Sequence, residues 1–194
     1  MDLTEVFGEG WCVTLAPGDV SEVLEGMGAV AAVEMCEGLE RATERLVSGA
    51  GPGVLLLGRE VSVGWTMVVE LEGTTGWVGM GTSVMAALSR GGRIVVSACE
   101  DPNQLIVQVA RNGMVLGWVD AVTGRRFGED FGPVGQTLTA VGFPAAGVDE
   151  PSGEAAALEP SERAVLAMRE VVGVEIEEAF FEGPWLGGIS TLGV

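Results

Sequence analysis

The sequence predicts an α+β fold in which an antiparallel, meander-like β-sheet carries helices packed mainly on one face. The middle of the chain contains short apolar runs joined by connections of a few residues, which suit hairpins better than the crossovers of a parallel sheet. Asn112-Gly113 is the strongest turn signal, because a type I′ turn needs positive φ at both central residues and these residue types tolerate it best. In the first and last quarters of the chain, apolar residues recur at helical spacing instead.

The first quarter predicts one strand followed by two helices. Residues 11–15 are an apolar run typical of a short strand. Asp19 is the expected N-cap of the first helix, with Glu22 three residues later as its capping-box partner. A second helix is expected over residues 31–46, where apolar side chains recur on one helical face. The members of that apolar stripe are Met35, Leu39, Ala42 and Leu46.

The middle of the chain predicts the sheet itself. Residues 65–71 alternate in polarity, with Trp65 and Val69 on the inward face and Glu70 on the opposite face, where we expect it to be exposed to solvent. A short helix, capped by Thr82 or Ser83, interrupts the strands. The other expected strands cover residues 54–57, 93–99, 105–110 and 115–122.

The last part of the chain predicts two further helices and the domain organisation. A short helix is expected near residues 134–141, and a longer one begins at Pro160-Ser161 and ends at Gly173. Between them, residues 144–160 are rich in Pro, Gly, Ala and acidic residues. We therefore divide the chain into a main α+β domain (1–143), a linker or mobile loop (144–160) and a C-terminal helical segment packed on the main domain (161–194).

Missing residue types remove much of the usual catalytic chemistry. The chain has no His, Tyr or Lys, and all ten basic residues are Arg. It therefore has no imidazole base, no Schiff-base amine and no P-loop lysine. Cys12, Cys36 and Cys99 match no metal-ligand spacing. We expect a non-catalytic protein without a cofactor, and the absence of residues with AT-rich codons indicates a GC-rich bacterial genome.

Net charge restricts the possible partners. The formal charge is −18, of which residues 1–50 carry −8 and residues 151–194 carry −6. Nucleic acids and anionic membranes would be repelled, whereas a basic protein would be attracted. The N-terminus lacks the pattern of a signal peptide and no apolar run reaches about 18 residues, so we expect a cytoplasmic protein. The sequence does not indicate an oligomeric state.

Two glycine-rich segments and several carboxylates are candidates for ligand binding. Residues 49–53 precede an expected strand and not a helix, which favours a connector over a phosphate loop. Residues 79–83 directly precede a helix, where free backbone N–H groups could hold an anion or the Ser/Thr side chains could simply cap. No spacing selects a catalytic pair or a calcium loop among the acidic candidates. Those candidates are Glu70, Glu72, Asp120, Glu129 and Asp130.

The tryptophans and acidic clusters supply candidate partner-binding residues. Trp65, Trp77 and Trp118 lie on or beside expected strands, where core packing is the usual role, and a Trp that is exposed would become an interface anchor. Trp185 lies in a Gly-Pro-Trp-Leu-Gly-Gly segment and is the preferred candidate for an exposed docking residue. The candidate partner-binding residues are Trp185, Trp77, Glu37, Glu40, Glu44, Glu177 and Glu178.

Several short motifs, in order, resemble those of a known family. Gly64-Trp65-Thr66, Glu70 and residues 76–79 resemble a GWT-x-x-x-E…GW-x-G pattern of an uncharacterised domain-of-unknown-function family widespread in actinobacteria. Residues 88–97 and 181–188 are similar to later blocks of that family, whereas Thr74-Thr75 departs from its pattern. The resemblance implies one fold unit and a bacterial origin, and it supplies no catalytic residues.

These observations together favour binding over catalysis. The leading hypothesis is an acidic binding protein, of immunity or inhibitor type, that engages a basic protein partner. One alternative is a small-ligand or divalent-metal-binding module that uses carboxylates around the sheet. The other is a structural subunit of a bacterial assembly.

Overall fold

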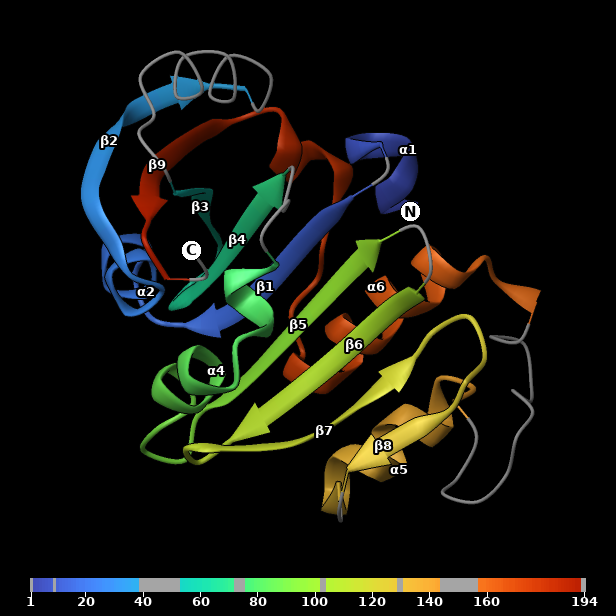
Figure 1. Cartoon of the computed structure of the whole chain (residues 1–194). Coiled ribbons are helices and arrows are strands. Elements are labelled where there is room, and N and C mark those ends of the chain that lie inside the picture. The colour runs from blue at the N-terminus through green and yellow to red at the C-terminus, as the bar shows by residue number, and fades with distance from the viewer. Residues whose placement is uncertain are drawn as a thin grey trace.

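The predicted α+β class is confirmed by the computed structural model, which describes residues 2–8, 10–38, 53–71, 76–101, 104–128, 131–143 and 157–192 (Figure 1). The strands are β1 (Trp11–Pro17), β2 (Ala29–Glu37), β3 (Val54–Ser62), β4 (Trp65–Leu71), β5 (Ile94–Asp101), β6 (Gln104–Arg111), β7 (Met114–Asp120), β8 (Arg126–Gly128) and β9 (Pro184–Ser190). The helices are α1 (Leu3–Phe7), α2 (Val20–Gly26), α4 (Thr82–Leu88), α5 (Gly132–Ala140) and α6 (Pro160–Val172), with 3₁₀ turns η1 (Val78–Met80) and η3 (Glu178–Phe181).

The described strands form one twisted sheet of nine strands in which every pairing is antiparallel. Their order is β2-β9-β3-β4-β1-β5-β6-β7-β8. The run from β5 to β8 is a meander, as the short connections predict. At its β6–β7 turn, Asn112 has φ 53° and Gly113 has φ 81°, which are the positive values that the predicted type I′ turn requires.

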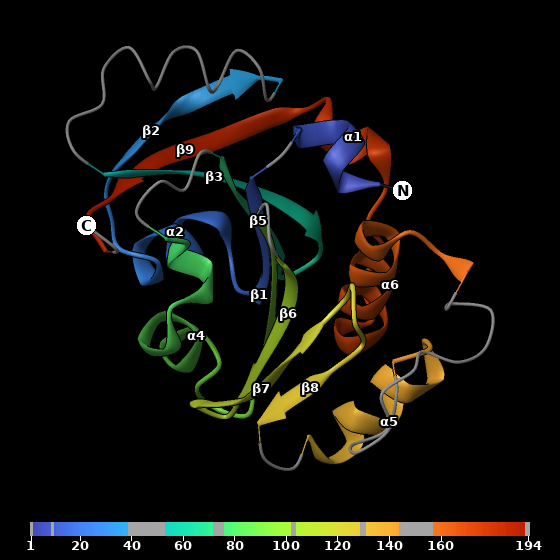
Figure 2. The same cartoon turned by 45° about the vertical axis from the view of Figure 1, so that its right-hand side comes forward.

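Helices lie on both sides of the central strands, as Figure 2 shows edge-on. On one side α1, α5 and α6 pack over the larger apolar cluster, which contains Leu138 and Met168. On the other side the shorter helices α2 and α4 cover a second cluster that contains Leu24 and Met85. Strand β1 is consequently buried along nearly its whole length.

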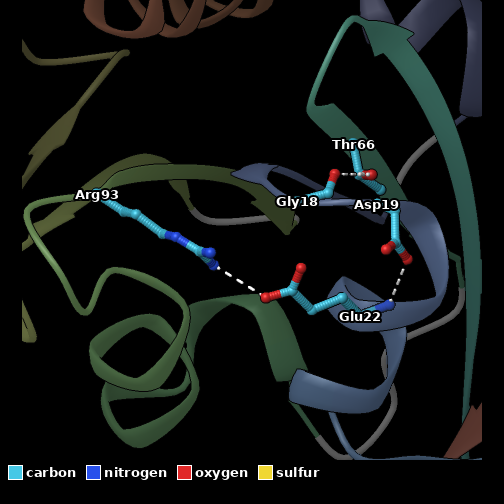
Figure 3. Close-up of polar contacts among 5 residues, drawn as sticks. All are labelled: Gly18, Asp19, Glu22, Thr66 and Arg93. Carbon is cyan, nitrogen blue, oxygen red and sulfur yellow. Dashed lines mark hydrogen bonds and ion pairs between the residues drawn. The ribbon is translucent and has the colours of Figure 1, made fainter.

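The N-terminus of α2 forms as predicted and is tied to neighbouring strands (Figure 3). The Asp19 carboxylate accepts a hydrogen bond from the Glu22 amide at 2.9 Å. Glu22 does not close the capping box, since its carboxylate pairs with Arg93 at 3.1 Å. The Thr66 hydroxyl donates to the Gly18 carbonyl at 2.9 Å, which joins this turn to β4.

Two local predictions in the first half are wrong. Residues 29–37 form strand β2 and not the start of a helix, while residues 39–46 of the predicted helix lie outside the described residues. β2 gains a hydrogen-bonded partner in β9, with Cys36 opposite Trp185, and such pairing overrides a weak helical propensity. Helix α4 is capped by Gly81 without any side-chain bond, and not by Thr82 or Ser83.

The C-terminal part contains the predicted helix and an additional strand. Helix α6 ends as expected at Gly173, which has φ 70° and donates its amide hydrogen to the Arg169 carbonyl at 2.7 Å. Beyond η3 the chain enters the sheet as β9, between β2 and β3. The segment that we expected to be helical therefore also completes the sheet. Of the expected linker, residues 144–156 lie outside the described residues. No helix in the described part of the chain is long and apolar enough to cross a lipid bilayer.

Candidate functional site

A cleft of about 280 Å³ opens on the face of the sheet that carries α4. The strands β5, β6 and β7 supply its floor and one wall, and the segment around η1 supplies the other wall. Its lining consists of Trp77, Met80, Cys99, Asp101, Gln104, Ile106, Gln108 and Trp118. Two indole rings, a thioether, two carboxamides and one carboxylate therefore face the same space.

Strand register places the floor residues side by side. Cys99 lies opposite Ile106, and Gln108 lies opposite Trp118. Asp101 lies opposite Gln104, whose side-chain amide donates to the Asp101 carboxylate at 2.9 Å. Because side chains at alternate positions share a face, this set arises from the pleat of three adjacent strands.

The two aromatic walls are held in place by different contacts. The ring of Trp118 stacks on Phe127, with centroids 4.0 Å apart and planes at 21°. On the other wall, the Gln108 side chain donates to the Met80 carbonyl at 3.4 Å, which joins η1 to β6. Stacking and this hydrogen bond order the cleft before any ligand arrives.

Glu70, on β4, anchors the segment that carries Trp77. Its Oε2 accepts the Val78 amide hydrogen and its Oε1 accepts the Gly79 amide hydrogen, both at 2.7 Å. Gly79 allows this approach because a Cβ there would lie 2.1 Å from Thr14 Oγ1 and 2.8 Å from Glu70 Oε1. No residue with a side chain fits without displacing the buried groups.

The burial of Glu70 corrects two predictions. The sequence predicts a solvated Glu70, but the side chain is 0% exposed, because η1 lies directly against it. Residues 79–83 were a candidate anion site, and in the structure the Gly79 amide binds an anion of the chain itself, the Glu70 carboxylate. Two charge-assisted hydrogen bonds offset part of the desolvation cost of that carboxylate.

The pKa values of three acidic groups in or near the cleft are raised, which favours their neutral forms. Burial raises the pKa of Glu70 to about 7, against the lowering effect of the Gly79 and Val78 amides. Burial, followed by the charge of Glu70, raises the pKa of the Cys12 thiol well above its ordinary value. Burial and the charge of Asp101 raise the pKa of Cys99 to about 12. Both thiols are therefore neutral at physiological pH and poor nucleophiles.

A small polar network surrounds Glu70 beneath the sheet surface. The hydroxyls of Thr14 and Ser97 are 2.9 Å apart and hydrogen-bonded, and Cys12 Sγ lies 3.4 Å from Ser97 Oγ. Cys12 also packs with Cys99 and the cleft residue Ile106. Cys12 lies opposite Glu70 in the register of β1 and β4, so it connects Glu70 to the floor of the cleft.

Of the residues that the sequence proposed for partner binding, the structure describes the side chains of Trp185, Trp77 and Glu177, and it places them apart. The expectation that Trp185 is exposed is wrong: β9 lies inside the sheet, so the ring is 0% exposed, packs near Phe181 and donates to the Phe181 carbonyl at 3.4 Å. Trp77 is half-buried and lines the cleft, whereas Glu177 is exposed elsewhere, just before η3. Outside the described residues or side chains lie Glu37, Glu40, Glu44 and Glu178.

Of the general carboxylate candidates, the structure describes Glu70 on β4 and Asp120 on β7, which are separated by three strands of the sheet. Asp120 caps the turn after β7, accepting hydrogen bonds from the Val122 amide at 2.8 Å and the Thr123 hydroxyl at 2.7 Å. Glu72, Glu129 and Asp130 lie outside the described residues. Among the side chains that the structure does describe, no three of His, Cys, Asp and Glu are grouped as metal ligands.

Sequence reasoning missed most of the cleft. It assigned Trp118 to the core and did not consider Asp101, Gln104 or Gln108. The available signal was the polar side chains at alternate positions of two adjacent strands, on a face otherwise filled by apolar residues. That alternation becomes informative only when the β5–β6 register, with Ser97 opposite Gln108, is known.

Comparison with known proteins gives one informative result. No curated protein and no solved structure matches the chain significantly. The model of one family matches residues 2–184, which includes every strand and helix of the described fold except β9, of which it reaches only the first residue, Pro184. The chain therefore belongs to a family of unknown function (DUF6461).

Proposed function

We propose that this chain is a non-catalytic acidic binding protein, of immunity or inhibitor type, that engages a basic protein partner on the face of the cleft. The observation that carries the proposal is the cleft itself. It joins Trp77 and Trp118 to the carboxylate of Asp101, and none of its lining residues is basic. Aromatic anchors beside acidic groups are the chemistry that recognises a basic surface.

The distribution of charge supports a role for the surface as a whole. Among the acidic side chains that the structure describes, Glu70 alone is buried, and the others are exposed or half-buried. The negative charge of the described residues, part of a net charge of −18 for the chain, therefore lies mainly at the surface. Such a field accelerates the approach of a basic partner and repels nucleic acid.

The chemistry of the site supports binding over turnover. The thiols of Cys12 and Cys99 are held neutral by burial, and the chain has no His, Lys or Tyr to act as a base. Both carboxylate oxygens of Glu70 already accept hydrogen bonds from backbone amides. We expect the protein to act in the bacterial cytoplasm, where buried thiols stay reduced.

A capture experiment with identification of the bound proteins tests this proposal. The full chain is immobilised and exposed to an extract at low and at high ionic strength, and retained proteins are identified and then rebound in purified form. We expect a basic protein that binds at low salt and is released at high salt, because salt screens exposed charges.

A matched pair of variants locates the interface. The Trp77→Ala/Trp118→Ala variant should lose the partner, whereas Val63→Ala, at a turn residue that is 94% exposed, should retain it. If no basic protein binds the wild-type chain at low salt, or if the partner binds the double variant equally well, the proposal is wrong.

A further inference from the structure

We propose that the aromatic cleft is an organic-cation site that receives one arginine side chain of the basic partner. This inference rests on the proposed function, and it names the chemical group of the partner that would occupy the cleft. It follows from the size, the charge and the rigidity of the cleft.

The size of the cleft suits a single side chain. Its volume of about 280 Å³ is at the lower end of the range, roughly 300–1,000 Å³, that small-molecule sites occupy. A nucleotide or a folded segment would need more room. A flat guanidinium group on its aliphatic stem can enter between aromatic rings and stack on them.

The charge of the cleft favours a cation over an anion or a neutral ligand. Asp101 is the charged member of the lining. Burial is the main reason that the pKa values of Cys99, which lines the cleft, and of Cys12 behind it are raised, and the charges of Asp101 and Glu70 add to the increase, as a negative potential at this place would. The same potential stabilises a positive group placed above them.

The donor set favours an organic cation over a metal ion. One carboxylate and two carboxamides line the cleft, and the described residues contain no group of three metal-ligating side chains. A guanidinium group requires fewer charged ligands than a metal ion. One carboxylate accepts its hydrogen bonds, and aromatic faces supply cation–π contacts. Gln104 and Gln108 add carboxamide oxygens as further acceptors.

The aromatic walls are already in position. Trp118 stacks on Phe127 and also lines the cleft. Trp77 directly precedes the two amides that Glu70 holds. Little conformational freedom remains to be lost on binding, so a weak but specific cation contact becomes measurable.

The experiment is a titration of the full chain with acetyl-arginine amide and with its neutral isostere, acetyl-citrulline amide. The indole N–H resonances of Trp77 and Trp118 are monitored by NMR and assigned with the Trp77→Phe and Trp118→Phe variants. We expect the arginine compound to shift both resonances and to bind at least about tenfold more tightly than citrulline, because citrulline lacks the charge.

Two variants that each remove one negative charge separate a local from a global effect. Asp101→Asn should weaken arginine binding about tenfold, since it removes the carboxylate in the cleft and keeps an acceptor for Gln104. Asp19→Asn should bind as the wild type does. Asn caps a helix as well as Asp. Asp19 also follows the last residue of β1, whereas Cys12 lies near the first residue of that strand. Equal effects of the two substitutions, or equal binding of arginine and citrulline, would overturn the inference.

The outcome also separates this inference from the proposed function. If acetyl-arginine amide leaves both indole resonances unmoved while the basic partner still binds, the cation site is wrong and the binding function stands. If the amide binds as expected while no basic protein is retained, the binding function fails and the cation site remains.

Discussion

The face of the sheet that packs against α6 and the face that carries the cleft bury different kinds of side chain. The first is closed by apolar residues such as Leu138, Met168 and Trp185, each fully buried. The second also has an apolar cluster, but it buries Glu70 and the hydroxyls of Thr14 and Ser97 next to an open cleft. Apolar burial stabilises both faces, and the cleft face in addition buries one acidic side chain, Glu70, beside the cleft that we propose binds a ligand.

The two faces should therefore respond differently to substitution. Truncating an apolar side chain on the α6 face should cost stability and leave the cleft unchanged. Altering the polar network on the other face should change both the stability and the environment of Trp77.

Trp185→Ala should lower the free energy of unfolding by about 4 kcal/mol, because it empties a large volume inside the apolar cluster. Urea denaturation measures the change, and Val63→Ala, at an exposed position, should change it by less than about 0.5 kcal/mol. The arginine titration of the folded variant should match the wild type. A loss below about 1 kcal/mol would mean that Trp185 contacts solvent, as its sequence context suggested.

Glu70→Gln should remove a specific pH dependence of stability. The folded-state pKa of about 7 exceeds the ordinary value of 4.5, so between these values the folded chain keeps a proton that the unfolded chain has lost. This stabilisation is fully present below about pH 4.5 and is lost as the pH rises through about 7, a change of about 3 kcal/mol.

Urea denaturation between pH 4.5 and pH 8 measures this change. The unfolding free energy of the wild type should fall, relative to Glu70→Gln, by that amount as the pH rises. Glu60→Gln, at an exposed carboxylate, should follow the wild-type profile. Parallel profiles for wild type and Glu70→Gln would show that Glu70 is not buried in its ionised form.

Gly79→Ala should destabilise the protein by about 2 kcal/mol, because the added methyl overlaps Thr14 and Glu70 and must displace η1. It should also shift the indole resonance of Trp77, which a purely apolar substitution on the α6 face should not do. Gly135→Ala, where the nearest atom to the new Cβ is Phe131 Cβ at 3.2 Å, should have a much smaller effect on both. Equal effects at the two glycines would remove the special role of the Glu70–Gly79 contact.

Much of the fold follows from local sequence signals. Asn112-Gly113 is sufficient to predict the β6–β7 turn, since its positive φ values are a property of those two residues. Asp19 predicts the start of α2 for the same kind of reason, because a cap bond spans three residues. The alternation of residues 65–71 identifies β4, although it does not reveal that both of its faces are buried.

The candidate site was much less predictable. Trp77 was identified by its residue type, but its neighbours Asp101 and Trp118 come from other strands and meet only through the register of β5, β6 and β7. The prediction for residues 31–46 failed at its start because β9, some 150 residues later, provides the hydrogen-bonding partner of β2. Neither the register of β5, β6 and β7 nor the pairing of β2 with β9 can be deduced from the spacing of nearby residues.

The α+β class, the Asn112-Gly113 turn, the Asp19 cap of α2, the Gly173 end of α6 and the strongly negative charge all follow from the sequence, since they depend on residue type or on neighbours a few positions apart. The burial of Trp185, the burial of Glu70 with hydrogen bonds to two backbone amides, and the aromatic cleft beside it are instead consequences of the tertiary structure. Burial and pKa depend on which distant segment covers a given face. That is a property of strand order and helix packing, and it is absent from the spacing of residues along the chain.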